Sequence, residues 1–308
     1  MKTRLNVFLL AFASVVLCSC NKFSSGLPTT KSIHVDENFC VIEINDFVNV
    51  TVIHADEGHK AGDIEIHAGE KLIDGIIADT ARDIAAIHND TLTLTKLVIR
   101  NNNAFNTFLP YNYDIDLTIY YDSLYKLIFN SNGTLETDTI KGIRIRESDT
   151  VVSSNCAIEI EGGSGEINAL LRCDKLTTKY QEGTSTVNLA GNVTFAYTSA
   201  SYNCHGQIHS KGLSTHIHYI KPYYSNTLIE AKAYHMLDVE NLNIGEVHYL
   251  RYWTTREDHI WNDSLHQTDT IITRVLCPEV IRYNGEYVNI WTYNNDENSI
   301  PGLVQDRE

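Results

Sequence analysis

The histidines that could bind a metal lie in the second half of the chain. His216 and His218 are two positions apart, so on a strand they share one face, and a pair of imidazoles on one face can bind zinc. His205 and His209 lie about one repeat earlier. The alternative is a solvated strand face in a chain with 13 histidines, and we expect no metal and no cofactor.

Carboxylates offer a second kind of chemistry, because glycosidases use two carboxyl groups at a fixed separation. Candidates on or near the repeated strands are Glu159, Glu161, Glu166, Asp174 and Glu182. No pair is singled out by its spacing, and no nucleophile elbow, phosphate loop or metal motif is present. The sequence therefore predicts a protein that is not an enzyme, with a polysaccharide-acting β-helix lyase or hydrolase as the alternative.

Aromatic side chains offer a third possibility, which is binding. Tyrosines in the repeated region could stack on sugar rings or line a protein contact. They are Tyr180, Tyr197, Tyr202, Tyr219, Tyr223 and Tyr224. The alternative is packing between strands, and a row of exposed tyrosines on one face would favour a glycan or envelope-protein ligand.

The elements that carry these residues are short runs of alternating apolar and polar residues, which is the period of a half-buried strand. Small-residue turns are expected at 163–165, 183–185 and 199–201. Repeat centres at Ser164, Thr184, Ser201, Tyr224 and Ile244 give steps of 20, 17, 23 and 20 residues. This period predicts an all-β fold, a β-solenoid or parallel β-helix-like stack of ~20-residue units preceded by an N-terminal β region. A β-sandwich is the alternative.

The chain divides into five segments in order. They are a lipoprotein signal peptide at 1–19, a tether at 20–37, an N-terminal β region at 38–122, β-solenoid repeats at 123–250, and a C-terminal β extension and tail at 251–308. Within the first β region, residues 72–86 fit a short helix or a strand equally well.

The leader has a basic start at Lys2 and Arg4 and an apolar run that is too short to span a membrane. It ends in Leu17-Cys18-Ser19-Cys20, which resembles the bacterial lipobox. The resemblance implies that Cys20 is lipidated and that the partner of the N-terminus is a membrane. We therefore predict a lipid-anchored cell-envelope protein at the outer membrane, with the periplasmic or surface face left open.

Charge and cysteine content limit the partners further. The 308 residues carry a net charge of −15, and loss of Lys2 and Arg4 with the leader gives −17. This balance argues against nucleic acid as a partner.

Beyond Cys20 five cysteines remain, an odd number, so at least one is a free thiol, and we expect buried, inert thiols.

A set of motifs in a fixed order resembles the head-GIN family of secreted domains, common in lipoproteins of Bacteroidota and labelled "putative auto-transporter adhesin". The motifs are residues 38–44, 49–52, 89–94, 115–119, 124–133, 163–165 and 183–192. The resemblance covers about 38–250. It implies a β-solenoid-like fold without established catalytic residues.

One further triplet resembles the acceptor motif of the general O-glycosylation system of Bacteroidota: Asp, then Ser or Thr, then an aliphatic residue or Thr. The seven possible acceptors are Thr80, Thr91, Ser123, Thr139, Thr150, Ser264 and Thr270. Random placement predicts roughly one such triplet from average composition. Turn chemistry also enriches Asp-Ser/Thr, so this alternative stays open.

Overall fold

The computed structural model describes residues 26–46, 48–87, 90–102, 115–146, 152–240, 245–262, 267–288 and 300–307. These ranges contain strands and one turn of 3₁₀ helix but no α-helix, which confirms the all-β prediction. Cys20 lies outside the described residues.

The N-terminal region holds the first nine strands. They are β1 (Pro28–His34), β2 (Val41–Asp46), β3 (Asn49–His54), β4 (Asp63–Gly69), β5 (Ile76–Ile87), β6 (Asp90–Asn101), β7 (Asp116–Tyr121), β8 (Lys126–Ser131) and β9 (Thr134–Ile140), with the 3₁₀ helix η1 (Ile73–Gly75) before β5. The expected tether is wrong for β1, because this strand pairs antiparallel with β4 along its whole length. The ambiguous segment 72–86 is one helical turn followed by a strand.

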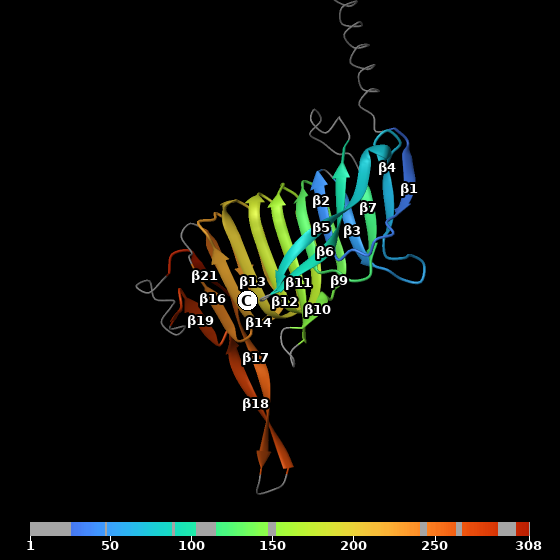
Figure 1. Ribbon diagram of the computed structural model, residues 1–308. Coiled ribbons are helices and arrows are strands. Elements are labelled where there is room, and N and C mark those ends of the chain that lie inside the picture. Colours follow the sequence, from blue (N-terminus) through green and yellow to red (C-terminus); the bar gives the residue numbers. More distant parts are fainter. Residues whose placement is uncertain are drawn as a thin grey trace, which may run out of the picture.

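The hairpin of β5 and β6 crosses the outer surface of the neighbouring strands (Figure 1). β6 pairs with β2, and Asp83 of β5 forms an ion pair with Lys126 of β8 at 2.7 Å. Lys126 also lies 3.6 Å from Glu159. Its alkyl stem and ammonium group are therefore covered, with the charge balanced by two carboxylates.

The second half holds the remaining strands, several of them long. They are β10 (Ile143–Arg146), β11 (Val152–Gly162), β12 (Glu166–Gly183), β13 (Thr186–Cys204), β14 (Gln207–Pro222), β15 (Leu228–Ala231), β16 (Met236–Val239), β17 (Glu246–Asn262), β18 (Gln267–Cys277), β19 (Val280–Tyr283), β20 (Glu286–Tyr287) and β21 (Leu303–Arg307).

Successive long strands pair in parallel at an offset near twenty residues. Glu166 of β12 lies opposite Thr186 of β13, and Tyr180 lies opposite Ala200. The first half of β12 also pairs with β9, whereas its second half pairs with β11. Each long strand thus contributes to two neighbouring series of parallel strands, which form the curled sheet in Figure 1. The pairing in this region is parallel, unlike that of an antiparallel β-sandwich.

The long strands change phase at a corner. In β12, Leu171 and Cys173 are buried, Asp174 is exposed, and the buried positions resume at Leu176. Because the side-chain period of a strand is two, one extra residue at the corner moves the following side chains to the other face. Uninterrupted alternation would place Phe195 and Tyr197 on the buried face of Val193, but both lie beyond the corner of β13 and are only partly buried.

The expected turn at 199–201 is also wrong. These residues continue β13, and Ala200 is fully buried opposite Pro222 of β14. The turn falls at His205 and Gly206 instead. A side chain at Gly206 would meet the Tyr180 hydroxyl at 2.0 Å, so packing and not only backbone conformation requires glycine here.

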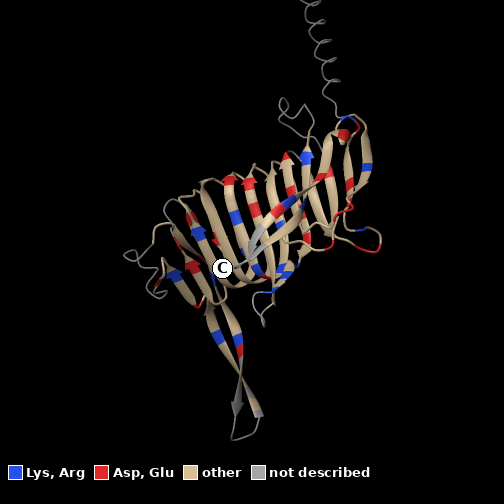
Figure 2. Ribbon diagram, in the orientation of Figure 1, with Lys and Arg blue, Asp and Glu red and all other residues tan. Residues whose placement is uncertain are grey.

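One apolar cluster runs through the whole sheet, from Phe39 to Leu303. The predicted C-terminal extension is split: β17 and β18 project as a separate antiparallel hairpin, while β19 and β21 pair in parallel with β16 and β17 (Figure 1). Among the described residues the buried carboxylates and cations are Lys126, Glu159 and Asp238. Figure 2 shows basic residues gathered around β10.

Candidate functional site

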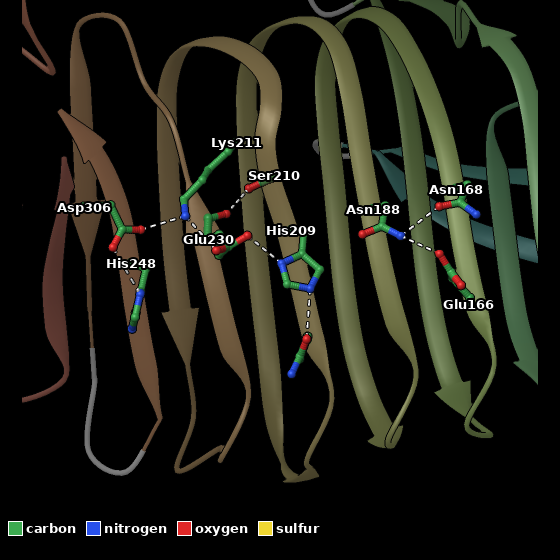
Figure 3. A network of polar contacts seen from close by, with 10 residues as sticks. Glu166, Asn168, Asn188, His209, Ser210, Lys211, Glu230, His248 and Asp306 are labelled. Carbon is green, nitrogen blue, oxygen red and sulfur yellow. Dashed lines mark hydrogen bonds and ion pairs between the residues drawn. The ribbon is translucent and has the colours of Figure 1, made fainter. Parts of the chain in front are cut away.

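Two polar surfaces lie on the outside of the long strands, and they differ in how far their side chains are already paired. The first, which we call the polar row, crosses the first halves of the strands from β12 to β21 (Figure 3). It consists of Glu166, Asn168, Asn188, His209, Lys211, Glu230, His248 and Asp306. These positions are neighbours because the strands pair in register, with Asn168 opposite Asn188 and Asn188 opposite His209.

The polar row satisfies itself. The amide of Asn188 donates to Glu166 and to Asn168, both at 2.8 Å. Glu230 contacts His209 Nδ1 at 2.5 Å and Lys211 Nζ at 2.6 Å. Partial burial raises the pKa of the Glu230 carboxyl, but hydrogen bonds from Lys211 and His209 outweigh it and the pKa is lowered. A hollow of about 450 Å³ with Leu170 and Ala190 in its lining lies beside the row. The polar side chains of the row are hydrogen-bonded to one another, so we assign the row a structural role, which is to hold neighbouring strands together.

Lys211 tests this assignment, because its ammonium lies 2.6 Å from Glu230 and 2.7 Å from Asp306 of β21. We expect Lys211→Met to remove the cation that Glu230 and Asp306 share and to loosen β21, with amide hydrogen exchange there faster by about fivefold. Exchange measured by NMR on wild type and variant gives the answer. Lys71→Met, an exposed lysine far along the chain, is the control, and unchanged exchange in Lys211→Met would contradict the assignment.

The second surface, the corner groove, follows the bend of the long strands and has a volume of about 730 Å³. It is lined by Arg144, Val152, Ser154, Arg172, Cys173, Asp174, Asn192, Val193, Thr194, Ser214, Thr215, His216 and Tyr234. Because Arg172 is opposite Asn192 and Asn192 is opposite Ser214, equivalent positions on β12, β13 and β14 present one column of polar side chains.

The corner groove, unlike the polar row, keeps unused hydrogen-bonding groups. Within the described ranges, no hydrogen bond, ion pair or ring contact involves the side chains of Arg144, Arg172, Asn192, Thr194 or Ser214. Other polar groups of the lining are engaged: Asp174 accepts from the backbone N–H and hydroxyl of Ser154 at 2.7 and 2.9 Å, and the Thr215 hydroxyl donates to the Lys232 carbonyl at 2.7 Å. Guanidinium, amide and hydroxyl groups without protein partners are suited to contacting a polar ligand.

An aromatic wall closes one part of the groove. The ring of His216 stacks with that of His235 at 5.2 Å between centroids and lies 5.8 Å from Tyr234. His235 contacts Glu279 at 2.8 Å, which fixes its ring. The flat surface of these rings is the kind of wall on which an apolar ligand face packs.

The predicted histidine pair is separated by the corner. His216 is exposed in the groove, whereas His218 is buried and hydrogen-bonded to Thr198 at 2.9 Å. Burial lowers the pKa of His218 to about 4. The expectation of a shared face is therefore wrong. His205 lies exposed at a turn and His209 in the polar row, and no group of three metal-binding side chains occurs in the described part of the chain.

The predicted carboxylates are dispersed as well. Asp174 lines the corner groove, Glu166 belongs to the polar row, and Glu159 pairs with Lys126 and Lys179. Burial raises the pKa of Glu161, with the charges of Glu43 and Glu159 adding to the shift. Glu182 is exposed beside the turn that ends β12.

The tyrosines form no single row. Tyr180 is buried and donates to the Ser185 carbonyl at 2.8 Å, so the packing alternative holds for it. Tyr202, Tyr223 and Tyr224 are exposed, while Tyr197 and Tyr219 are partly buried. Arg144, Arg172, Asn192 and Ser214 were not anticipated as site residues, although polar residues repeating near a twenty-residue step give a signal for the last three.

The five cysteines in the described ranges are free thiols, four of them buried: Cys156, Cys173, Cys204 and Cys277. Burial raises the pKa of Cys204 to about 11 and that of Cys173 to about 12, with the charge of Asp174 adding to the latter. Thiols of this kind are poor nucleophiles.

The predicted glycosylation positions fall in different settings. Ser123 is exposed in the turn before β8, Thr270 is exposed on β18, and Thr80 and Thr139 are partly buried within strands. Thr91 lies on β6, and Thr150 and Ser264 fall outside the described residues.

The chain was compared with protein families, curated sequences and solved structures, and only solved structures gave a match. No family model and no curated protein sequence matches this chain, so the head-GIN resemblance stays a prediction. The fold is similar to that of a protein from Bacteroides fragilis described as a "putative adhesin", with a TM-score of 0.55 and 17% identity over 73% of this chain and 88% of that one.

Weaker likenesses extend to two Parabacteroides proteins. One from Parabacteroides distasonis, described as a "putative lipid binding protein", has a TM-score of 0.47 and 17% identity over 73% of this chain and 90% of that one. Another from Parabacteroides merdae, described as a "putative adhesin", has a TM-score of 0.43 and 17% identity over 73% and 89% of the two chains. No helix among the described residues is long and apolar enough to cross a membrane.

Proposed function

We propose that this chain is a non-catalytic binding protein of the cell envelope and that its corner groove holds an extended, hydroxyl-rich ligand, a glycan. One observation carries the proposal: Arg172, Asn192, Thr194 and Ser214 line a continuous groove across adjacent strands with no protein partner within the described ranges. A ligand lying across the strands would meet a polar group at each strand spacing of about 4.8 Å.

Binding is favoured over the alternative of a polysaccharide lyase or hydrolase. Hydrolysis of a glycosidic bond uses two carboxyl groups, and the described lining of the groove supplies one, Asp174, which Ser154 already engages. The word adhesin in the description of the Bacteroides fragilis structure agrees with a binding role. At 17% identity, the similarity in fold supports a binding role only by analogy.

The parallel offset near twenty residues supports a β-solenoid in which each unit buries its inner face against the next. We further propose that lipidated Cys20 holds the protein at the outer membrane. Under this proposal the seven Asp-Ser/Thr triplets are glycan acceptors, and glycans on the exposed Ser123 and Thr270 shield a turn and a strand.

A binding screen tests the proposed function. Purified protein is applied to an array of neutral and acidic oligosaccharides, and the strongest ligands are measured by calorimetry. Asn192→Ala combined with His216→Ala should weaken binding by about tenfold or more, because it removes an amide contact and the ring wall together.

A matched control is available in Asn203→Ala with His205→Ala, the same residue types at an exposed turn. This control should bind within about twofold of wild type. Equal losses in both double variants, no bound glycan, or turnover of any glycan would each refute the proposal.

A further inference from the structure

We propose that the corner groove selects an acidic glycan, a polysaccharide containing uronic acid, whose carboxylates are bound by Arg144 and Arg172. This inference rests on the proposed function and adds the chemical class of the ligand. It concerns two side chains that no motif in the sequence singles out.

The first step is charge. In a chain with a net charge of −15, many cations are taken up by carboxylates, as in the pairs of Lys96 with Glu43 and Lys221 with Glu240. Arg144 and Arg172 are exposed in the same groove, and neither contacts a carboxylate or any other partner in the described ranges. Figure 2 shows this basic area around β10. The groove therefore offers two free guanidinium groups on an otherwise acidic protein.

The second step is spacing. Arg144 of β10 pairs in register with Ser154 of β11, and β12, which carries Arg172, is the next strand along. The β11–β12 register puts Asp174 next to Ser154, so Arg172 lies two strand spacings and two residues along the strand from Arg144. The backbones of the two arginines are therefore roughly 12 Å apart. Each guanidinium can bind its own carboxylate in a bidentate manner, so the arrangement suits a chain with acidic groups at intervals. Asp174, two residues after Arg172 on β12, is engaged by Ser154 at 2.7 and 2.9 Å.

The third step is the rest of the lining, which distinguishes a sugar from other anions. Asn192, Thr194 and Ser214 supply amide and hydroxyl groups that match sugar hydroxyls. The rings of His216 and Tyr234, 5.8 Å apart between centroids, line the same groove and offer a flat wall for a sugar face. A duplex nucleic acid, with one negative charge per about 1.7 Å of its axis, would be repelled by the acidic remainder of the protein more strongly than a polysaccharide with widely spaced carboxylates. An acidic peptide satisfies the arginines but leaves the hydroxyl-matching groups unused.

The test uses matched pairs of ligands that differ only in carboxylate charge. Polygalacturonate, hyaluronan and chondroitin sulfate are each compared with their carboxyl-methylated forms, and polyglutamate serves as an acidic polymer without sugar. Wild type should bind at least one uronate polymer about tenfold more tightly than its methyl ester and than polyglutamate. Arg144→Gln combined with Arg172→Gln should remove this preference and flatten the salt dependence of binding.

Arg82→Gln combined with Lys71→Gln, two exposed cations outside the groove, is the control for net charge and should retain the preference. Circular dichroism and the thermal midpoint confirm that the variants are folded. Equal binding of acid and ester, or equal binding of polyglutamate, overturns the inference. If the Asn192/His216 variant loses glycan binding but wild type shows no preference for the acid, the proposed function stands and the acidic-glycan inference fails. If wild type binds no glycan, both are refuted.

Discussion

Replacing Gly183 by alanine is expected to lower the stability of the folded chain by roughly 3 kcal/mol. Gly183 closes β12 with a φ of +104°, a conformation that L-residues with a side chain rarely adopt. An added Cβ would also lie 2.4 Å from the carbonyl oxygen of Gly163, the equivalent turn one unit earlier. Since the backbone N–H of Thr184 donates to this same carbonyl at 2.9 Å, the clash cannot be relieved without separating the two turns. The shift in denaturant midpoint measures the loss.

Gly285→Ala separates the two causes. Gly285 has a φ of +84°, but the nearest atom to an added Cβ is Arg282 Nη2 at 3.8 Å, which is ordinary contact. This variant therefore carries the backbone strain without the clash, and a loss of about 1 kcal/mol is expected. Equal losses for Gly183→Ala and Gly285→Ala would show that the stacked turns do not constrain each other.

The glycine turns at 163–165 and 183–185 could be predicted because glycine marks tight turns at a repeated spacing. The turn at 199–201 was misplaced because Ser199, Ala200 and Ser201 are small for a different reason. Ala200 lies in the core opposite Tyr180 and Pro222, where two strands leave little room. Composition alone does not separate a small residue in a turn from a small residue under close packing.

The corner of each long strand was not predictable from alternation. A run such as 166–183 reads as one strand or two, and the shift of one residue at Asp174 reverses which side chains face the core. The corner also builds the candidate site. Arg172, Asn192 and Ser214 are separated by about one repeat each, so they meet only when the strands stack in the register observed.

His218 is a second residue whose exposure simple alternation predicts wrongly. Counted from His216 it belongs to an exposed pair, but the corner turns it inward, where it lies opposite Ala196 and Leu237. Its Nε2 meets the Thr198 hydroxyl at 2.9 Å, while its Nδ1 is buried without a hydrogen-bond partner in the described ranges. Desolvation without a compensating charge is the reason that the pKa of this ring falls to about 4, from 6.5 in an exposed histidine.

This burial makes stability depend on pH with a definite sign. Below pH 6.5 the unfolded chain protonates His218 while the folded chain keeps it neutral, so the unfolded state binds more protons and stability falls as the pH falls towards 4. Carboxylates with lowered pKa, such as Glu230, add their own loss at low pH. A difference between wild type and a His218 variant isolates the histidine contribution.

His218→Gln keeps a polar group that can reach Thr198 but cannot titrate. Between pH 7.5 and pH 4.5 wild type should lose roughly 2–3 kcal/mol more stability than the variant, the value that follows from a pKa lowered from 6.5 to about 4. Urea unfolding followed by circular dichroism at the two pH values measures both losses. His205→Gln, at an exposed ring, should behave as wild type. If His218→Gln loses as much stability on acidification as wild type, the ring is either solvated or already charged in the folded protein, and the inward side of the corner is not the apolar environment that the burial of His218 indicates.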